Sequence, residues 1–387
     1  MKRYLDDLIT RDLEKKMVFV VGPRQVGKTT LSRGLLQANA PESLDQPGVY
    51  LNYDVAQDRA LIEQMNWSRR ATLVVLDEIH KMTEWKRWLK GVFDGRQNQQ
   101  KILVTGSARM DTFAQAGESL AGRFFSWRLH PISVREWCEH SGSSAEVAMQ
   151  HLLVRGGYPE PCLAIEAEDA TRWRKQYFEG LVRNDVLEFS RLNELTVMRL
   201  FIDLLRQRVG SPLSLASMAR DLAVSPVTLK RYLDILEALY IVFVVRPWHH
   251  NIARATLQAP KVYFFDNGLV QGDDGVKFEN LVACHLLKHV HWHQDAKGQD
   301  IDLHYVRTKD GAEVDFCLSN SEDGKPTLTH LIESKVSDTK LHAALARFAQ
   351  QWAKAEAVQL VRDQPNTIDL GRICIEPAAG WLRKLSA

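Results

Sequence analysis

The segment GPRQVGKT at residues 22–29 constrains the fold of this chain more than any other part of its sequence. It consists of a glycine, four variable residues, and then Gly-Lys-Thr. The apolar run 18–21 precedes it, and residues 30–37 follow it with the apolar spacing of a helix. A glycine-rich loop between a buried strand and a helix is a building block of parallel α/β sheets, so we expect that architecture for the N-terminal part of the chain.

The same segment has the composition of a phosphate-binding loop. Two glycines let the backbone N–H groups wrap a phosphate, and the helix N-terminus adds the positive end of its dipole. Lys28 is then expected to reach the β- and γ-phosphates of ATP, and the Thr29 hydroxyl to ligate magnesium. A glycine-rich turn without a ligand is the alternative. The residues expected to bind ATP are Gly22, Pro23, Arg24, Gln25, Val26, Gly27, Lys28, Thr29 and Thr30.

A second motif, LVVLDE at residues 73–78, places two acids directly after a fully apolar strand. In open α/β sheets, ligands bind at the carboxyl ends of the strands, so both acids are expected at the nucleotide. Asp77 is predicted to hold magnesium through water. Glu78 is predicted to orient or deprotonate the attacking water, with Lys28 as the other catalytic group.

A third apolar strand, 101–105, runs into Gly106 and Ser107. A polar side chain at this point can contact the γ-phosphate, so Ser107 is predicted as a catalytic residue and Thr105 is its competitor. Simple capping of the strand is the alternative for both.

An arginine offered to the nucleotide of a neighbouring subunit is a further expectation. Arg123, in the segment LAGR, is the candidate, and Arg109 and Arg128 compete for the role. A solvated surface arginine is the alternative in each case.

Composition places the chain among ordinary globular proteins. Its 387 residues, 45% of them hydrophobic, suffice for two or three domains at roughly 150 residues each. A net charge of +2 means that any nucleic-acid surface must be local. Five scattered cysteines without C-x-x-C spacing favour a reducing compartment over a disulfide framework. No apolar run approaches the ~20 residues of a membrane span, and the acidic N-terminus is unlike a signal peptide, so we expect a cytoplasmic protein.

The pattern of elements divides the chain into four predicted domains. Residues 1–137 alternate strands and helices, with strands expected at 18–21, 49–53, 73–76 and 102–105. Residues 129–132 are expected to end this unit. Residues 138–192 are predicted as a helical connector. Residues 193–258 and 259–387 are predicted as a winged-helix-like domain and as an α/β domain built around an acid cluster.

Two helices in the third domain have the order of a winged helix-turn-helix. Residues 213–222 and 226–239 are predicted as helices, with Ser225 as the N-cap of the second, and a strand follows at 240–245. Lys230 and Arg231 lie where a recognition helix contacts a DNA groove. The alternative is a helix pair that only packs or oligomerises.

The acids of the last domain resemble the core of PD-(D/E)xK nucleases. Asp315 in EVDF, and Glu333 and Lys335 in IESK, match the acid and the E-x-K of that core, and Glu279 matches an additional acid on the preceding helix. The resemblance implies a divalent metal held by Glu279, Asp315 and Glu333, with Lys335 near the scissile phosphate. A surface cluster of ion pairs, or an inherited fold without activity, is the alternative.

Taken together, these motifs resemble the AAA+ superfamily and, more closely, a prokaryotic family of ATP-binding proteins. In that family an AAA+ core precedes a C-terminal domain of unknown function. The matching segments cover nearly the whole chain in order: 22–30, 76–81, 105–107, 120–123, 155–160, 183–185, 230–239, 261–269, 278–280, 313–316 and 332–335. The resemblance implies ATP and Mg²⁺ as cofactors and a homo-oligomer. A ring, in which Arg123 would serve the next subunit, is one form that such an oligomer takes.

The function expected from the sequence is ATP hydrolysis that drives conformational change on DNA. Two downstream segments that resemble nucleic-acid folds make DNA the expected partner. Two alternatives remain open: a DNA nuclease licensed by ATP, and a nucleotide-dependent signalling or scaffold switch that binds protein.

Overall fold

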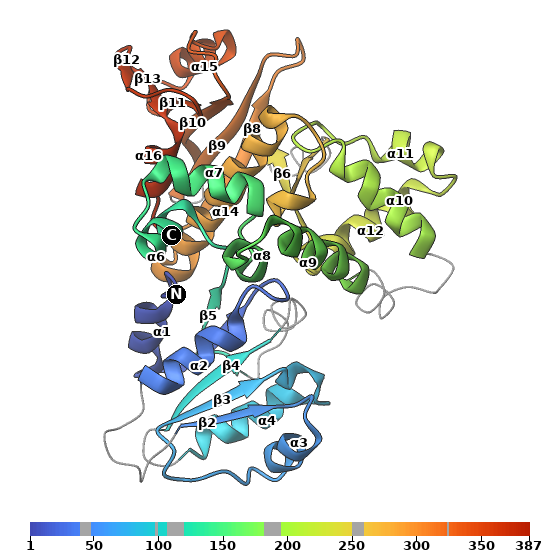
Figure 1. The fold of residues 1–387 in the computed structure, drawn as a ribbon, viewed down its shortest axis with the longest axis vertical. Coiled ribbons are helices and arrows are strands. Elements are labelled where there is room, and N and C mark those ends of the chain that lie inside the picture. The colour runs from blue at the N-terminus through green and yellow to red at the C-terminus, as the bar shows by residue number, and fades with distance from the viewer. Residues whose placement is uncertain (39–47, 97–99, 107–119, 182–194, 250–258, 323–324) are drawn as a thin grey trace. The chain divides into compact units, whose positions relative to one another are not determined.

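The computed structural model describes residues 1–38, 48–96, 100–106, 120–181, 195–249, 259–322 and 325–387 (Figure 1). The chain forms two compact units. Unit 1 comprises residues 1–130 with 238–240, and unit 2 comprises residues 131–237 with 241–387. The first boundary lies close to the one predicted at residue 137. The finer division of unit 2 into three domains stays a prediction.

Unit 1 is built on a parallel sheet of five strands, which confirms the predicted α/β class. The strands occur in the order β2-β3-β4-β1-β5, so β4 lies between the strand of the glycine-rich loop and the strand of the two acids. The elements are α1 (Asp6–Leu13), β1 (Met17–Val21), α2 (Lys28–Ala38), β2 (Val49–Asn52), α3 (Ala56–Glu63), β3 (Leu73–Asp77), the 3₁₀ turn η1 (Ile79–Lys81), α4 (Trp85–Asp94), β4 (Lys101–Thr105) and β5 (Phe124–Arg128).

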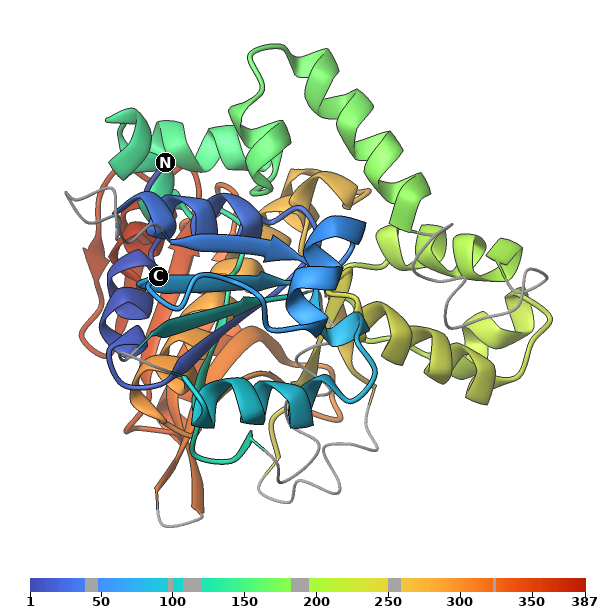
Figure 2. The ribbon, with the colours of Figure 1, turned by 90° about the horizontal axis from the view of Figure 1, so that it is seen from below.

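The central strands of unit 1 are buried on both faces, as their continuous apolar sequences predict. Phe19 of β1 packs in one core with Trp85 and Leu89 of α4. Side chains alternate along a strand, so Val18 and Val20 point to the opposite face, where α1 and α2 contact the sheet. Figure 2 shows α2 and α4 on the two sides of the strands. The sheet is therefore held from both sides, which fixes the carboxyl ends of its strands.

Residues 129–132 were expected to end this unit, and the edge strand that lies just before them was not predicted. The edge strand β5 is Phe124–Arg128, and it pairs with β1 from Met17↔Phe124 to Val21↔Arg128. An edge strand is only half-buried, so FFSWR lacks the continuous apolar pattern of β1 and β3. Residues 129–132 instead leave the sheet after one further backbone hydrogen bond, from Leu129 to Val21.

Unit 2 begins with helices and ends in a mixed sheet of eight strands in the order β12-β13-β11-β10-β9-β8-β6-β7. Its helices are α6 (Val134–Ser141), α7 (Ala145–Arg155), α8 (Pro159–Leu163), α9 (Ala167–Gly180), α10 (Leu195–Arg206), α11 (Leu215–Asp221), α12 (Pro226–Ala238), the 3₁₀ turn η5 (Asn267–Leu269), α14 (Asp274–Lys297), α15 (Ala343–Gln351) and α16 (Ala378–Lys384). Its strands are β6 (Val242–Pro247), β7 (Lys261–Phe264), β8 (Ile301–Arg307), β9 (Glu313–Glu322), β10 (Lys325–Lys335), β11 (Glu356–Val361), β12 (Ile368–Asp369) and β13 (Ile373–Pro377).

The helix pair predicted in the third domain is present as α11 and α12. Ser225 caps α12, because its hydroxyl accepts a hydrogen bond of 3.0 Å from the backbone N–H of Thr228. The strand after the pair, β6, forms an antiparallel pair with β7 and a short parallel pair with β8. The helix pair is thus continuous in sequence with the same sheet that carries the acids of the C-terminal segment.

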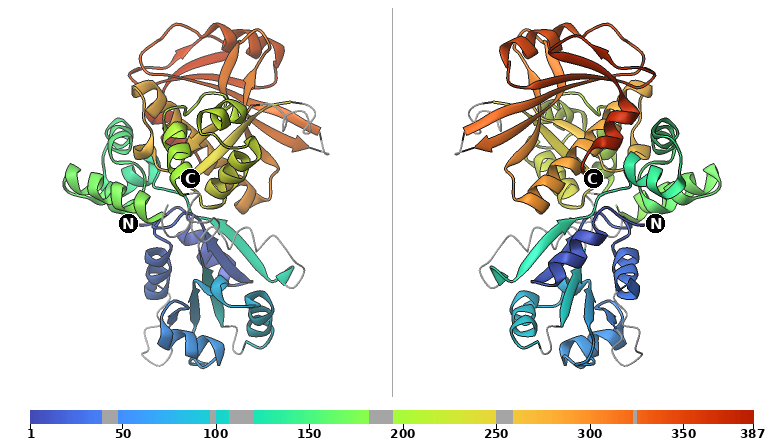
Figure 3. Two further views of the ribbon diagram at one scale, coloured as in Figure 1. Left: turned by 90° about the vertical axis from the view of Figure 1, so that its right-hand side faces the viewer. Right: turned by 90° about the vertical axis from the view of Figure 1, so that its left-hand side faces the viewer.

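The longest strands, β9 and β10, form an antiparallel hairpin in the middle of this sheet (Figure 3). The pairing of Ile332 with Phe316 brings the next residue of β10, Glu333, beside Asp315 of β9. Leu345 and Phe348 of α15 pack with Leu331 in a core on one face of the hairpin. Alternation then leaves Ile332 and Phe316 on the other face, where Phe316 contacts Tyr263 of β7.

Candidate functional site

The glycine-rich loop of unit 1 has the backbone that a phosphate cradle requires. Gly22 has φ +148° and Gly27 has φ +100°, which side chains rarely allow, and Gln25 also lies at a positive φ of 59°. A Cβ on Gly22 would stand 2.4 Å from the carbonyl oxygen of Leu129. The segment that follows β5 therefore lies so close to the glycine-rich loop that only glycine fits at position 22.

Lys28, the first residue of α2, is buried inside this loop. Its ammonium donates hydrogen bonds to the carbonyl oxygens of Gly22 (3.0 Å) and Pro23 (2.7 Å). Burial lowers the pKa of Lys28 to about 8, while Glu78 and Asp77 act in the opposite direction. A buried cation bonded only to neutral carbonyls is a ready partner for an anion, and phosphate oxygens supply that charge.

Asp77, at the end of β3, is the centre of a hydrogen-bond network. The Thr29 hydroxyl donates to its Oδ2 at 3.2 Å, and the Thr105 hydroxyl donates to its Oδ1 at 2.6 Å. The Tyr50 hydroxyl also donates to Oδ2. Burial, then the bond to Asp77, raises the pKa of Tyr50 to about 12, so the phenol keeps its proton. The hydroxyl of Thr29 and the carboxylate of Asp77 are the hard oxygen ligands that magnesium prefers, so these residues fit a magnesium ion.

Tyr50 is a residue of the site that the sequence motifs did not predict. Tyr50 belongs to β2, which pairs with β3 through Asn52↔Asp77. Its contact with Asp77 depends on the order of strands in the sheet, and VYLN has no spacing that marks it. Thr105 was an expected competitor of Ser107 for a site role. Ser107 and Arg109 lie outside the described residues, so their predicted roles stay predictions.

Glu78 adopts a left-handed backbone, with φ 57° and ψ 23°, directly after the strand. Its N–H donates to the Thr105 carbonyl at 2.9 Å, which anchors the turn to β4. Its carboxylate lies 3.5 Å from the ammonium of Lys81 and 3.6 Å from Nε2 of His80. Burial raises the pKa of Glu78, with Lys81 opposing. A positive φ in a glutamate costs about 1 kcal/mol and recurs where a functional carboxylate must point in a set direction.

Arg123 is bound within its own unit. Its guanidinium forms a two-point ion pair with Asp94 at the end of α4, with Nε 2.9 Å from Oδ1 and Nη2 3.1 Å from Oδ2. Its side chain keeps 29% of its surface exposed. A role at a neighbouring subunit's nucleotide would require Arg123 to leave Asp94, so that role stays a prediction. Arg128, a competitor for the same role, is the last residue of β5.

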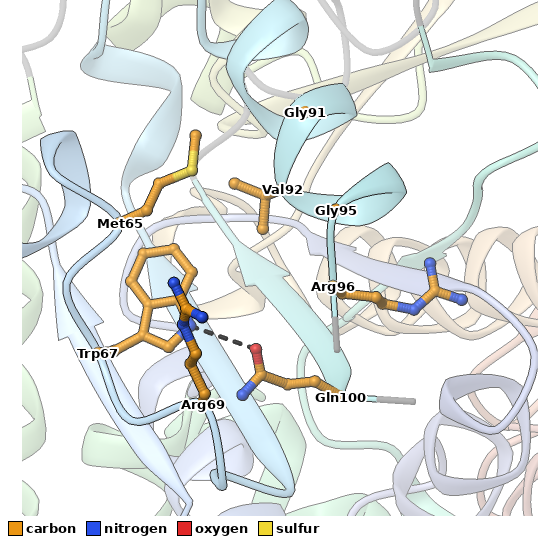
Figure 4. A pocket seen from close by; sticks show the side chains of 8 residues that line it. All are labelled: Met65, Trp67, Arg69, Gly91, Val92, Gly95, Arg96 and Gln100. Atoms are coloured by element: carbon orange, nitrogen blue, oxygen red, sulfur yellow. Dashed lines mark hydrogen bonds between the residues drawn. The ribbon is translucent and has the colours of Figure 1, made fainter. Parts of the chain in front are cut away.

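A pocket of about 180 Å³ lies where the strands of the unit 1 sheet begin, at the end of the sheet opposite the glycine-rich loop (Figure 4). It is lined by Trp67 and Arg69 before β3, by Gln100 before β4, and by Arg96 after α4. The indole N–H of Trp67 donates to the side-chain oxygen of Gln100 at 3.3 Å. Because the strands are parallel, their starts lie at the edge remote from the glycine-rich loop. This pocket is therefore separate from the nucleotide site.

Unit 2 brings the predicted nuclease residues together. The backbone N–H of Asp315 donates to Glu333 Oε2 at 3.2 Å, and Lys335 donates to Glu333 Oε1 at 2.6 Å. Glu279 of α14 accepts hydrogen bonds from Tyr263 (2.7 Å) and Lys261 (3.2 Å). Lys261 and Tyr263 enter the site from β7. Both lie in the segment 261–269 that resembles the family, but neither was predicted as a site residue.

The electrostatics of this cluster favour protonated acids. Burial, then the charge of Asp315, raises the pKa of Glu279 to about 7. The same two causes, in the same order, raise the pKa of Glu333 to about 8. Among the described residues no group of three or more His, Cys, Asp or Glu side chains is arranged to hold a metal ion. The metal role of Glu279, Asp315 and Glu333 and the nuclease role of Lys335 stay predictions.

The two residues predicted to contact DNA lie on the surface of α12. Lys230 and Arg231 are exposed, and so are their neighbours Val227 and Asp234. Lys230 forms an ion pair with Asp234 one turn later. The structure thus leaves the N-terminal half of α12 open to solvent within unit 2, on the side away from the buried Leu229 and Leu233.

Comparison with known proteins follows the division of the chain. An AAA domain matches residues 14–138, and two domains of unknown function, DUF8612 and DUF4143, match residues 147–276 and 274–373. No helix in the described part of the chain has the length and apolar character needed to cross a bilayer.

Three curated relatives extend over most of the chain. "Uncharacterized protein Rv2008c" of Mycobacterium tuberculosis and "Uncharacterized protein Mb2031c" of Mycobacterium bovis are each 30% identical over 349 residues, covering 86% of this chain and 75% of the relative. "Uncharacterized protein MJ1544" of Methanocaldococcus jannaschii is 21% identical and covers 86% of this chain and 83% of its own.

Likenesses among solved structures are weaker. AMPPCP-bound DnaA from Aquifex aeolicus is 15% identical, with a TM-score of 0.33 over 60% of this chain and 86% of that chain. Drosophila ORC bound to DNA is 13% identical, with a TM-score of 0.24 over 67% of this chain and 89% of that chain. These TM-scores are too low to support an argument about fold or function.

The family assignment therefore rests on the relatives and the matching domains. The mycobacterial relatives align over three quarters of their length at 30% identity. The AAA domain and the DUF4143 domain match in the order predicted from the motifs. The chain belongs to the prokaryotic family of AAA+ ATPases that carry a C-terminal domain of unknown function.

Proposed function

We propose that this protein hydrolyses ATP in the presence of magnesium and uses the cycle to change conformation on DNA. The observation that carries the ATPase part is the network in which Asp77 accepts hydrogen bonds from Thr29 and Thr105, beside the buried Lys28. All five cysteines are free thiols, which fits the reducing cytoplasm where ATP is abundant.

Each residue of the nucleotide site has a role that its position supports. The N–H groups of residues 22–30 cradle the phosphates, and Lys28 moves from the loop carbonyls to the β- and γ-phosphates. Thr29 and Asp77 hold magnesium, which neutralises charge on the phosphates when it is bound. Thr105 keeps Asp77 in position.

Glu78 acts as the general base. Its raised pKa brings the carboxylate closer to neutral pH, where a base accepts a proton from water most effectively. Its left-handed backbone and its bond to Thr105 fix the carboxylate at the carboxyl end of β3. Ser107 is proposed to contact the γ-phosphate. Arg123 is proposed to leave Asp94 and complete the site of the next subunit in a homo-oligomer.

DNA is the proposed partner because α12 presents a solvent-exposed cationic half. Lys230 and Arg231 lie on the exposed face of the second helix of a helix-turn-helix pair, where such folds contact a groove. Electrostatic contact with phosphates makes this binding dependent on salt.

The test is steady-state ATP hydrolysis with and without double-stranded DNA. The wild type is compared with K230E/R231E and with Lys309→Glu, a charge change at an exposed turn of unit 2. Stimulation by DNA in the wild type and in Lys309→Glu, lost in K230E/R231E, supports the proposal. Hydrolysis indifferent to single-stranded, double-stranded and branched DNA contradicts it and favours the protein-binding switch.

The alternative of an ATP-licensed nuclease has its own signature. It requires metal-dependent cleavage that is lost in Lys335→Ala. The position of Lys261 among the acids of unit 2 stands against it.

A further inference from the structure

A buried lysine lies among the acids Glu279, Glu313 and Asp315 of unit 2. Lys261, the first residue of β7, has 1% of its side chain exposed. Its ammonium is 2.7 Å from Glu313 Oε1, 3.2 Å from Glu279 Oε1 and 3.8 Å from Asp315 Oδ1. A buried ammonium needs paired charges, and here three carboxylates from α14 and β9 surround it.

The carboxylate oxygens of the cluster are already engaged by protein donors. Asp315 Oδ2 accepts from the N–H and the hydroxyl of Ser334, at 2.9 and 2.7 Å. Glu313 Oε2 lies 2.8 Å from Arg307 Nη1. A divalent metal that took these carboxylates as ligands would compete with the donors that already occupy their oxygens.

Glu333 is engaged in the same way. Its Oε1 accepts from Lys335 at 2.6 Å and lies 3.1 Å from Nδ1 of His342, and its Oε2 accepts from the N–H of Asp315. Glu279 Oε1 accepts from both Lys261 and Tyr263. The residues present therefore do not fit the metal that a PD-(D/E)xK nuclease would hold here.

Charge balance leads to the same conclusion. Four carboxylates, from Glu279, Glu313, Asp315 and Glu333, face the three cations Lys261, Lys335 and Arg307. The carboxylates therefore outnumber the cations by only one. A divalent ion bound to these carboxylates would lie close to the ammonium of Lys261. Two positive charges that are close together in a buried site repel each other strongly.

We infer that Lys261 is the built-in cation of this cluster and takes the place of a divalent metal in the nuclease-like site. Its ammonium joins β7, α14 and β9 by ion pairs, as a metal would join its ligands. The site consequently has no divalent ion at rest and does not cleave DNA by metal-activated water. This inference is independent of ATP hydrolysis in unit 1.

The test measures Mn²⁺ binding by electron paramagnetic resonance in the nucleotide-free, full-length protein. All proteins carry Asp77→Asn, which removes the magnesium carboxylate of unit 1. Lys261→Met removes the cation, and Lys325→Met makes the same chemical change at an exposed position of β10. We expect no tight site with Lys261 present or in Lys325→Met, and one Mn²⁺ per chain in Lys261→Met with at least tenfold higher affinity.

Two further proteins keep the test decisive if Lys261→Met folds poorly. Lys261→Met with Glu313→Gln removes one charge of each sign and is expected to bind Mn²⁺ as well. Asp315→Asn with Lys261 intact identifies any binding by the cluster. A tight Mn²⁺ site in the protein with Lys261 that disappears in Asp315→Asn would overturn the inference. Failure of both Lys261 variants to bind Mn²⁺ while folded would overturn it too.

Discussion

The hydroxyl of Thr105 donates a 2.6 Å hydrogen bond to Oδ1 of Asp77 across the β3–β4 pair. Thr105 is also paired with Val20 of β1, so it lies between the strand of the glycine-rich loop and the strand of the acid. Oδ1 is thereby held by the sheet, and Oδ2 is directed toward Thr29 and Tyr50. Asp77 therefore has one carboxylate oxygen fixed and the other facing Thr29, where the proposed magnesium ion would bind.

Tyr50→Phe is expected to lower the Mg²⁺ concentration that half-saturates ATP hydrolysis. The Tyr50 hydroxyl occupies Oδ2 of Asp77. Without it, that oxygen is available to magnesium-bound water, and one hydrogen bond to a charged group corresponds to a change of about three- to tenfold. Tyr53→Phe is the control, because that hydroxyl donates to the exposed Glu63. A weaker magnesium affinity in Tyr50→Phe, or equal shifts in both variants, would contradict the role of Tyr50.

Gly22 in the glycine-rich loop and Gly34 in α2 allow a matched comparison of stability. Gly22→Ala is expected to destabilise the protein by about 3 kcal/mol or more, because a Cβ would meet Leu129 at 2.4 Å with φ at +148°. Gly34→Ala lies within α2 with nothing within 4 Å of the added Cβ. It is expected to stabilise the protein by roughly 0.5–1 kcal/mol. Urea unfolding measures both, and a Gly22→Ala cost no larger than that of a surface substitution would show that the loop is not closed as described.

Proton uptake on ATP binding follows from the burial of Lys28. Its pKa of about 8 in the free protein means that near pH 8 a large fraction of Lys28 lacks its proton. Phosphate charge raises that pKa, so binding at pH 8 takes up protons. The heat of binding in buffers of different ionisation enthalpy measures the uptake. Lys28→Arg is expected to show none from this position, since arginine stays protonated.

The sign of the effect on stability provides a second check on Lys28. Its pKa is lower in the folded protein than the ordinary lysine value of 10.5, so it contributes stability above 10.5 that is lost as pH falls through about 8. Nucleotide should therefore stabilise the protein more at pH 7 than at pH 9.5. An ATP-induced rise in melting temperature that grows with pH would contradict this picture.

The motif residues were predictable because their chemistry is local. Lys28 and Thr29 follow the second glycine of the loop directly. Asp77 and Glu78 directly follow the apolar run 73–76, which predicts a buried strand. Tyr50 and Lys261 were not predictable for the opposite reason. Tyr50 contacts Asp77 because β2 and β3 are neighbours in the sheet, which no local motif indicates. Lys261 forms an ion pair with Glu313, which lies 52 residues later in the sequence.

The same distinction applies to the elements. The fully buried strands β1, β3 and β4 were predicted within a residue or two, because burial on both faces gives a continuous apolar run. The half-buried edge strand β5 was not predicted, since FFSWR carries no such run. The helix pair α11 and α12 was predicted from its N-cap and Pro226.

Stability is expected to fall as pH rises from about 4.5 to about 8, through Glu279 and Glu333. Their pKa values of about 7 and about 8 are higher than the ordinary value of 4.5, so they contribute stability that is full below 4.5 and lost as pH rises through those values. Glu279→Gln should show a smaller loss of stability between pH 4.5 and pH 7. Glu168→Gln, at an exposed position of α9, should keep the wild-type slope. Chemical denaturation at several pH values measures these slopes, and equal slopes in all three proteins would refute the assignment to Glu279.

The measurement that tests the central claim most directly is ATP binding beside steady-state hydrolysis in Glu78→Gln, with magnesium present. The account predicts that the variant binds ATP within about threefold of the wild type, while turnover falls by about 10²- to 10⁴-fold, the contribution of a general base. Lys28→Ala, by contrast, should lose binding itself. Turnover in Glu78→Gln within twofold of the wild type would contradict the account, because Glu78 would then not be the group that activates water.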